Sequence, residues 1–186
     1  ATSKSFGQGS MQNTGVPLDV AIENAGFFEI LQPDGTSVFT RDGAFKLNST
    51  GKIVTSDGLP VKGLDSIDPG TTQITIGSDG SVSTLVNGTT VKKAPFTLAR
   101  FPNSSGLQSI GRNLFRETES SGKAETGGTP GQNGFGTLAQ GFLEMSNVEV
   151  VQEMVNMIAA QRAYEINSKT IQAADEMMGM ANNLHR

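Results

Sequence analysis

The sequence has no cysteine and no tryptophan, and it holds one histidine and one tyrosine among 186 residues. Without cysteine, the chain can form no disulfide, no thiol nucleophile and no cysteine-based metal site. The single histidine, His185, lies next to the last residue. Catalysis by histidine and metal sites built from several histidines are therefore excluded as well.

Long apolar runs and clusters of basic residues are also missing. The chain has 14 Lys and Arg against 18 Asp and Glu, for a net charge of −4. Binding to nucleic acid or to an anionic membrane surface requires clustered basic residues, and a membrane-spanning helix requires about 20 apolar residues in succession. We expect no nucleic-acid partner and no membrane insertion.

Motifs for phosphate, calcium and nucleophilic chemistry are not found either. The Gly-rich stretch 127–136 matches neither G-x-G-x-x-G nor the P-loop pattern, and the Asp-Gly pairs lack the twelve-residue spacing of a calcium loop. No G-x-S-x-G or paired-carboxylate pattern occurs. The sequence therefore predicts no catalytic residue, no cofactor and no metal, and a protein that is not an enzyme.

Short strands separated by turns are expected up to about residue 116. Leu18, Val20 and Ile22 alternate with other residues at the period of a half-buried strand. Further strands are expected at 27–31, 37–40, 44–47, 52–55, 73–76, 81–85, 90–93 and 96–101, with turns at Asp34-Gly35, Asp42-Gly43, Asp57-Gly58, Asp79-Gly80 and Asn87-Gly88 and a loop at 103–111. Asp-Gly and Asn-Gly favour tight turns. This spacing predicts an antiparallel β-sandwich or barrel-like sheet.

The periodicity changes at Ser146. Ser146 and Glu149 have the spacing of a capping box, and the residues that follow contain no proline and one glycine. They predict a helix over 146–184, about 60 Å long at 1.5 Å per residue. The expected fold class is mainly β followed by one long C-terminal helix, α+β overall. Its segments are an extended stretch 1–17, a β-rich outer domain 18–116, a Gly-rich connector and return segment 117–145, and the helix.

One face of the predicted helix carries a stripe of apolar and small residues at steps of three and four. This main stripe consists of Val148, Val151, Val155, Ile158, Ala159, Ala163, Ile166, Thr170, Ala173, Ala174, Met177, Ala181 and Leu184. Arg162 lies close to it, while Met154, Met157, Ile171, Met178 and Met180 are expected off it. A helix that is apolar on more than one side normally has more than one partner. We predict a subunit interface here.

The long helix needs a partner that the rest of the sequence does not offer. Isolated helices are marginal in water, and helices in proteins gain most of their stability by packing an apolar face. Residues 1–16 are polar and contain glycine, and the β-rich part has few apolar residues to spare. We expect the partner in a segment outside this sequence or in other subunits.

Three blocks of the chain resemble the flagellar rod and hook proteins. The blocks are Gly141–Lys169 with Leu143-Glu144, Ser146-Asn147-Val148 and Gln161-Arg162-Ala163-Tyr164-Glu165; Gly26-Phe27-Phe28 with Thr40-Arg41-Asp42-Gly43-Ala44-Phe45; and Ile110-Gly111 with Asn113-Leu114-Phe115. Together they extend over nearly the whole chain. Gln161–Lys169 and Thr129-Pro130-Gly131 are most similar to the distal-rod members. Members of this family begin with a long N-terminal helix, so this sequence is expected to start after it.

The resemblance implies a structural subunit that polymerises helically into a stiff shaft, with terminal helices in an inner tube and the β-rich domain outside. The implied partners are copies of the protein itself, other rod and hook proteins, and the basal-body ring proteins around the rod. It implies a location in the flagellar basal body after export by the flagellar type III apparatus. The alternatives are a proximal-rod or hook subunit, a monomeric β-sandwich binding module, or a glycosidase-like β enzyme.

Overall fold

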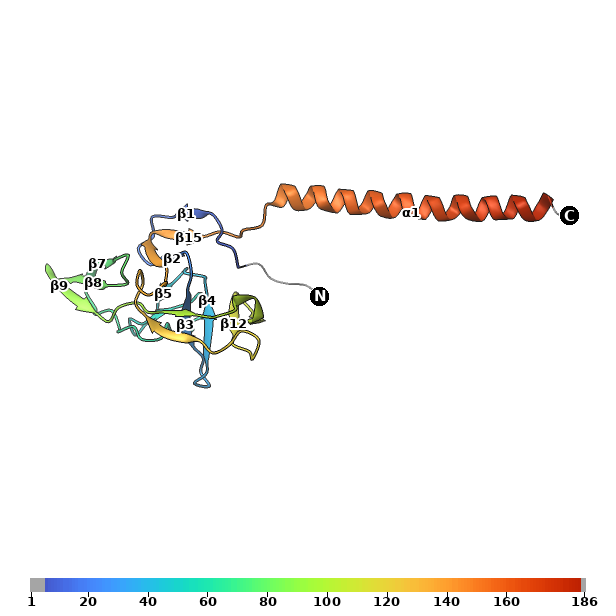
Figure 1. Ribbon diagram of the computed structural model, residues 1–186. Helices are drawn as coiled ribbons and strands as arrows, with labels where there is room; N and C mark the ends of the chain where they lie inside the picture. The colour runs from blue at the N-terminus through green and yellow to red at the C-terminus, as the bar shows by residue number, and fades with distance from the viewer. Residues whose placement is uncertain (1–5, 185–186) are drawn as a thin grey trace. The chain divides into compact units, whose positions relative to one another are not determined.

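The computed structural model describes residues 6–184, with side chains up to Met180. It divides into two compact units, one ending at Asn147 and the other beginning at Val148. The first, called the β unit below, is made of antiparallel strands, and the second is helix α1 (Val150–Leu184) (Figure 1). The predicted fold class, antiparallel β structure followed by one long C-terminal helix, is confirmed.

The largest sheet of the β unit has six strands. Its order is β11 (Gln108–Gly111), β12 (Leu114–Arg116), β4 (Ser37–Thr40), β3 (Phe27–Leu31), β10 (Leu98–Arg100) and β13 (Glu125–Gly128). Successive side chains of a strand point to opposite faces, so Phe27 and Phe28 lie on different sides of this sheet. Both are buried, which shows that the sheet is covered on both faces.

Smaller sheets complete the β unit. They are β1 (Met11–Asn13) with β15 (Phe142–Glu144), β2 (Val20–Glu23) with β14 (Thr137–Gln140), β5 (Lys46–Leu47) with β6 (Ile53–Val54), and β7 (Thr71–Ile76) with β8 (Val82–Val86) and β9 (Thr89–Lys93). A short 3-10 helix, η1 (Ser104–Gly106), precedes β11. The first two pairings join the start of the chain to residues 137–144, so the β unit closes on itself.

Phenylalanine fills the two cores of the β unit. In the main core the ring of Phe28 meets the rings of Phe45 and Phe96 edge-on, at centroid distances of 5.0 and 5.8 Å. On the other face of the sheet, a second cluster joins Phe6, Phe27, Phe39, Phe101 and Phe115. Edge-to-face pairs of this kind add stability beyond the area they bury. In a chain without tryptophan, phenylalanine supplies the large rings of both cores.

Several predicted strands and turns differ in the structure. Residues 108–111 form β11 rather than part of a loop, and β2 is buried on both faces because Ala21 is as inaccessible as its neighbours Val20 and Ile22. Asp42-Gly43 is not a positive-φ turn. Gly43 is required there because the chain passes close to Val20: the Val20 amide donates a hydrogen bond to the Gly43 carbonyl oxygen, and a Cβ on Gly43 would collide with the carbonyl oxygen of Val20.

The segment 117–145, expected as a connector, belongs to the β unit. It contributes β13, β14 and β15, which pair with β10, β2 and β1. Its glycines allow close packing: a Cβ on Gly128 would collide with the ring of Phe135, and one on Gly136 with the carbonyl oxygen of Glu23. Glycine content alone does not separate a flexible linker from a tightly packed strand, and the prediction was wrong for this reason.

The helix begins later than the capping box at Ser146 and Glu149 predicts. Its first backbone hydrogen bond joins the amide of Glu153 to the carbonyl oxygen of Glu149, so Glu149 stands at the N-cap position and Ser146 lies before the helix. Residues 142–147 pair with the β unit through backbone and side-chain hydrogen bonds, so the helix begins only after them. Among the described residues, no helix is sufficiently long and apolar to cross a membrane.

Candidate subunit-interface surface

Helix α1 exposes its apolar side chains. Its sequence favours helix because it lacks proline and is rich in Ala, Met, Gln and Glu, which are good helix formers. Within the described side chains, every residue from Val150 to Met180 is exposed except Ser168 and Ala174, which are half-buried. Soluble proteins rarely leave a large apolar surface open unless it binds something, so this surface is the candidate functional site.

The predicted interface residues lie on this exposed surface. The large ones are each more than half exposed: Val148, Val151, Met154, Val155, Met157, Ile158, Ile166, Ile171, Met177 and Met178. Ala159, Arg162 and Ala163 are exposed too. The Ala181 and Leu184 side chains lie outside the described ones, as do residues 1–5 and His185. The structure therefore places these residues on one element, except Val148, which lies two positions before the start of α1.

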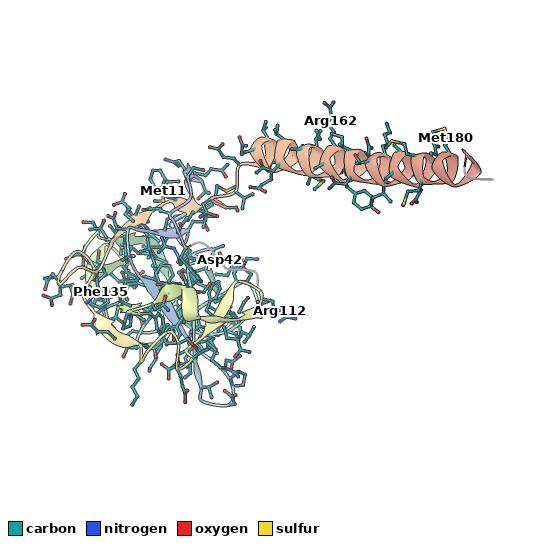
Figure 2. The ribbon with its side chains drawn as sticks, turned by 45° about the vertical axis from the view of Figure 1, so that its right-hand side comes forward. Met11, Asp42, Arg112, Phe135, Arg162 and Met180 are labelled. Atoms are coloured by element: carbon teal, nitrogen blue, oxygen red, sulfur yellow. The ribbon has the colours of Figure 1, made fainter. Side chains whose placement is uncertain are left out.

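One residue lies on a different side of the helix from the side expected. Figure 2 shows Arg162 and Met180 projecting from the same side of α1. Their separation of eighteen residues equals about five full turns at 3.6 residues per turn. Since Arg162 borders the main stripe, Met180 belongs to the main-stripe side and not to the residues off it.

Sequence reasoning missed Tyr164 and Val150 as surface residues. Tyr164 is the most exposed of the large apolar and aromatic side chains of α1, at 78%. Both residues fall outside the steps of three and four that define the main stripe. The signal that identifies them is a spacing of seven residues relative to Met157 and Ile171.

A buried ion pair stands just before the helix. The guanidinium of Arg41 contacts the carboxylate of Glu144 at 2.8 Å, and both side chains are largely buried. Arg41 also donates to the carbonyl oxygens of Asn24 and Gly26 and lies over the ring of Phe27. Glu144 accepts a further hydrogen bond from the amide of Gly9. This pair fixes β15, the last strand before the helix, to the main sheet.

The first described residues run beside the last residues of the β unit. The side-chain amide of Asn147 donates to the carbonyl oxygen of Gly7, and the amide of Met145 donates to that of Ser10. Gly9 packs so closely that a Cβ would collide with the carbonyl oxygen of Met145. Residues 7–13 and 142–147 therefore form one paired, two-stranded segment. The chain continues from this segment into α1.

The surface of the β unit offers little for chemistry. One small pocket is lined by residues that include Thr40, Asp42, Ser56, Asp57 and Arg112, of which Asp57 and Arg112 form an ion pair at 3.5 Å. Within residues 6–184, no group of three His, Asp or Glu side chains is placed to hold a metal ion. The exposed helix remains the strongest candidate site.

Two family models match the chain, one within the β unit and one that runs from the last strands of the β unit through α1. The flagellar hook protein FlgE/F/G D1 domain matches residues 21–84, and the flagellar basal body rod FlgEFG protein C-terminal region matches residues 139–184. The second match covers the end of β14, the whole of β15 and the whole of α1. The fold and the exposed helix thus define a protein of the flagellar rod and hook class.

Comparison with individual proteins identifies the family within this class to which the chain belongs. A flagellar basal-body rod protein FlgG of Borreliella burgdorferi is 50% identical over 192 residues, covering 100% of this chain and 71% of the relative. The FlgG of Bacillus subtilis is 43% identical, covering 94% of this chain and 68% of the relative. The chain belongs to the FlgG family of flagellar basal-body rod proteins. It is a structural subunit in the flagellar basal body, and the predicted distal-rod assignment is confirmed.

Proposed function

We propose that the protein polymerises through helix α1 into a helical shaft that transmits torque from the flagellar motor to the hook. One observation carries this proposal: the large apolar side chains of α1 are more than half exposed. A helix in this state gains nothing from burial, although burial supplies most of the stability of helices in proteins. Contact with other subunits removes this apolar surface from water.

The shape of the contact favours an open polymer. The exposed surface continues from Val148 to Met180, along most of the helix. A helix buried over this length by neighbours lying alongside it forms a continuous tube wall. A contact between different faces of identical subunits repeats without closing when its rotation does not return to the start, and the product is a helical filament. The β unit, which has its own cores, lies outside the tube in this proposal.

The proposed partners follow from the same arrangement. Copies of this chain and other rod and hook proteins contact α1 along the shaft axis. The basal-body ring proteins surround the shaft and face the β unit. We assign the protein no enzymatic activity, because its exposed apolar helix surface is suited to packing against other subunits.

Electron microscopy of the purified protein tests the proposal. Val155→Asp and Ile158→Asp place a carboxylate in the middle of the main stripe, and each is expected to abolish filaments while the β unit stays folded. Gln161→Glu introduces the same charge about 150° from the centre of the main stripe, at 100° per residue, and is expected to assemble. Filaments of normal length and number from Val155→Asp and Ile158→Asp would show that the interface lies elsewhere.

A further inference from the structure

All seven methionines of the chain lie outside the two cores of the β unit. Five of them belong to α1 and are exposed by 58% to 66%, namely Met154, Met157, Met177, Met178 and Met180. We call these five the helix methionines. Of the other two, Met145 is 48% exposed and Met11 is half-buried in β1. The chain therefore concentrates its sulfur on the candidate interface surface and fills its cores with other apolar residues.

The helix methionines are spread around the circumference of α1. At about 100° per residue, Met177 and Met180 lie within about 40° of Ile166 on the main stripe, and the other three lie about 120° to 180° from it. Figure 2 shows sulfur atoms on opposite sides of the helix. The widest arc without a methionine is about 100°. A neighbour that packs along the length of α1 therefore contacts at least one sulfur, whichever side of the helix it covers.

Methionine is the only sulfur-containing residue of the chain, because cysteine is absent. A hydroperoxide converts an accessible methionine to methionine sulfoxide. With hydrogen peroxide, the sulfur lone pair forms an S–O bond to one peroxide oxygen and the O–O bond breaks. The second oxygen takes the proton of the first and leaves as water, so the sulfur loses two electrons and the peroxide gains them. The exposed helix methionines should react ahead of the half-buried Met11.

Oxidation changes the surface of α1 more than it changes the β unit. The sulfoxide is polar and chiral, whereas the thioether is apolar and flexible. A sulfoxide on the free subunit remains in water, and the cores of the β unit contain no methionine to be altered. A sulfoxide buried against a neighbouring subunit loses its hydrogen bonds to water, and burying an unpaired polar group is unfavourable. Oxidation therefore acts against assembly and leaves the fold of the β unit intact.

We propose that the helix methionines are a modification site at which a hydroperoxide stops the free subunit from joining the polymer. In the assembled shaft the same sulfur atoms are buried between subunits and protected from the oxidant. Methionine sulfoxide reductase reverses the modification: a dithiol is oxidised to a disulfide, the thioether is restored and water is released. This inference rests on the proposed function and adds a reversible control to it.

Peroxide treatment of the purified chain before and after assembly tests the proposal. Treatment before assembly is expected to raise the concentration needed for filaments on the order of tenfold or more, the effect of burying one or more unpaired polar groups. NMR signals of the β unit should stay in place, and methionine sulfoxide reductase should restore assembly. Peptide mass spectrometry should find the helix methionines oxidised on the order of tenfold more slowly in filaments than in free subunits, because packing excludes the oxidant.

A variant with leucine at all five positions separates the helix methionines from the rest of the chain. Leucine is apolar and close to methionine in volume, and it forms no sulfoxide. Whatever concentration this variant needs for filaments, peroxide is expected not to change it. The matched control combines Met11→Leu with Met145→Leu and keeps the helix methionines. Its assembly should remain as sensitive to peroxide as that of the unmodified chain.

The proposal is overturned if peroxide affects the leucine variant as strongly as the unmodified chain. It is also overturned if the unmodified chain assembles normally with its helix methionines oxidised. Both results leave the proposed function standing, because untreated subunits still form filaments. If the leucine variant does not assemble, partial oxidation of the unmodified chain decides: loss of assembly that does not follow the sulfoxide content of the helix contradicts the proposal. Failure of the untreated, unmodified chain to form filaments would overturn the proposed function and this inference together.

Discussion

In the β unit the side chains of Phe28 and Ile30 are fully buried, whereas on helix α1 those of Val151 and Tyr164 are exposed by 75% and 78%. The β unit alternates its large apolar residues across paired strands and covers both faces of its main sheet. The helix distributes its apolar residues around most of its circumference and covers none of them. One region thus completes its own core, whereas the other leaves its apolar side chains exposed and, in the proposed function, contributes them to a core shared by several subunits.

The sharpest test of this contrast truncates one large side chain in each region. Phe28→Ala removes a ring at the centre of the main core and is expected to lower the free energy of unfolding of the β unit by about 3–5 kcal/mol. Met157→Ala removes a side chain that the free subunit does not bury, so the same free energy should not change. Urea unfolding, followed through NMR signals of the β unit, measures both effects.

The contrast would be broken by either of two results. A Met157→Ala variant that destabilises the β unit as much as Phe28→Ala would show that the helix is packed within the single chain. A Phe28→Ala variant with an unchanged unfolding midpoint would show that the main core does not hold the β unit together. Filament formation should follow the reverse order, with Met157→Ala impairing it in a folded subunit.

The ion pair between Arg41 and Glu144 is expected to make the next largest contribution to the stability of the β unit. Arg41→Ala leaves the Glu144 carboxylate largely buried with its charge unpaired, and such a loss costs about 3 kcal/mol. Glu144→Gln leaves the guanidinium with its carbonyl partners on Asn24 and Gly26 and should cost less than Arg41→Ala. Thermal unfolding of the two variants shows which of them is the less stable. Equal stability of Arg41→Ala and the unmodified chain would contradict a structural role for this pair.

Much of this architecture was predictable from local patterns. The strands 27–31 and 37–40 were predicted at the residues where β3 and β4 lie, because short apolar runs bounded by Asp-Gly turns are a local signal. The long helix was predicted from its composition and periodicity, although its start moved from Ser146 to Val150. These features depend on residues close together in the sequence.

Features that depend on distant residues were not predictable. The pairing of β1 with β15 and the contact of Arg41 with Glu144 join residues more than a hundred positions apart. The glycines at 128 and 136 suggested flexibility, and their close packing against Phe135 and Glu23 follows only from the fold. The candidate interface was found by periodicity, except for Val150 and Tyr164, whose spacing of seven does not follow the main stripe.

Replacing glycine by alanine is expected to have opposite effects on stability in the β unit and in helix α1. Gly43→Ala forces a Cβ against the Val20 carbonyl oxygen, and overpacking of this kind costs about 1–3 kcal/mol. Gly179 lies in α1 with no atom within 4 Å of where a Cβ would stand. Gly179→Ala should therefore stabilise the helix by about 0.5–1 kcal/mol, the propensity difference between alanine and glycine. Circular dichroism during heating measures both, and a destabilising Gly179→Ala would show that the helix is already closely packed.

The smallest expected effect concerns a single turn of the β unit. Asp34 accepts hydrogen bonds from the hydroxyl of Thr36 at 2.6 Å and from its amide at 2.9 Å, and these bonds, the hydroxyl first, lower the pKa of Asp34 from its ordinary value of 3.8. A folded-state pKa below the unfolded one contributes stability above pH 3.8, and this contribution is lost as the pH falls through the folded value. Thr36→Val removes the hydroxyl and keeps the branched shape, so the pKa of Asp34 should rise toward its ordinary value. Asp79, whose pKa is lowered by Ser81 in a matching turn, serves as the internal control in one NMR titration. An unchanged Asp34 pKa would show that the Thr36 amide alone sets it.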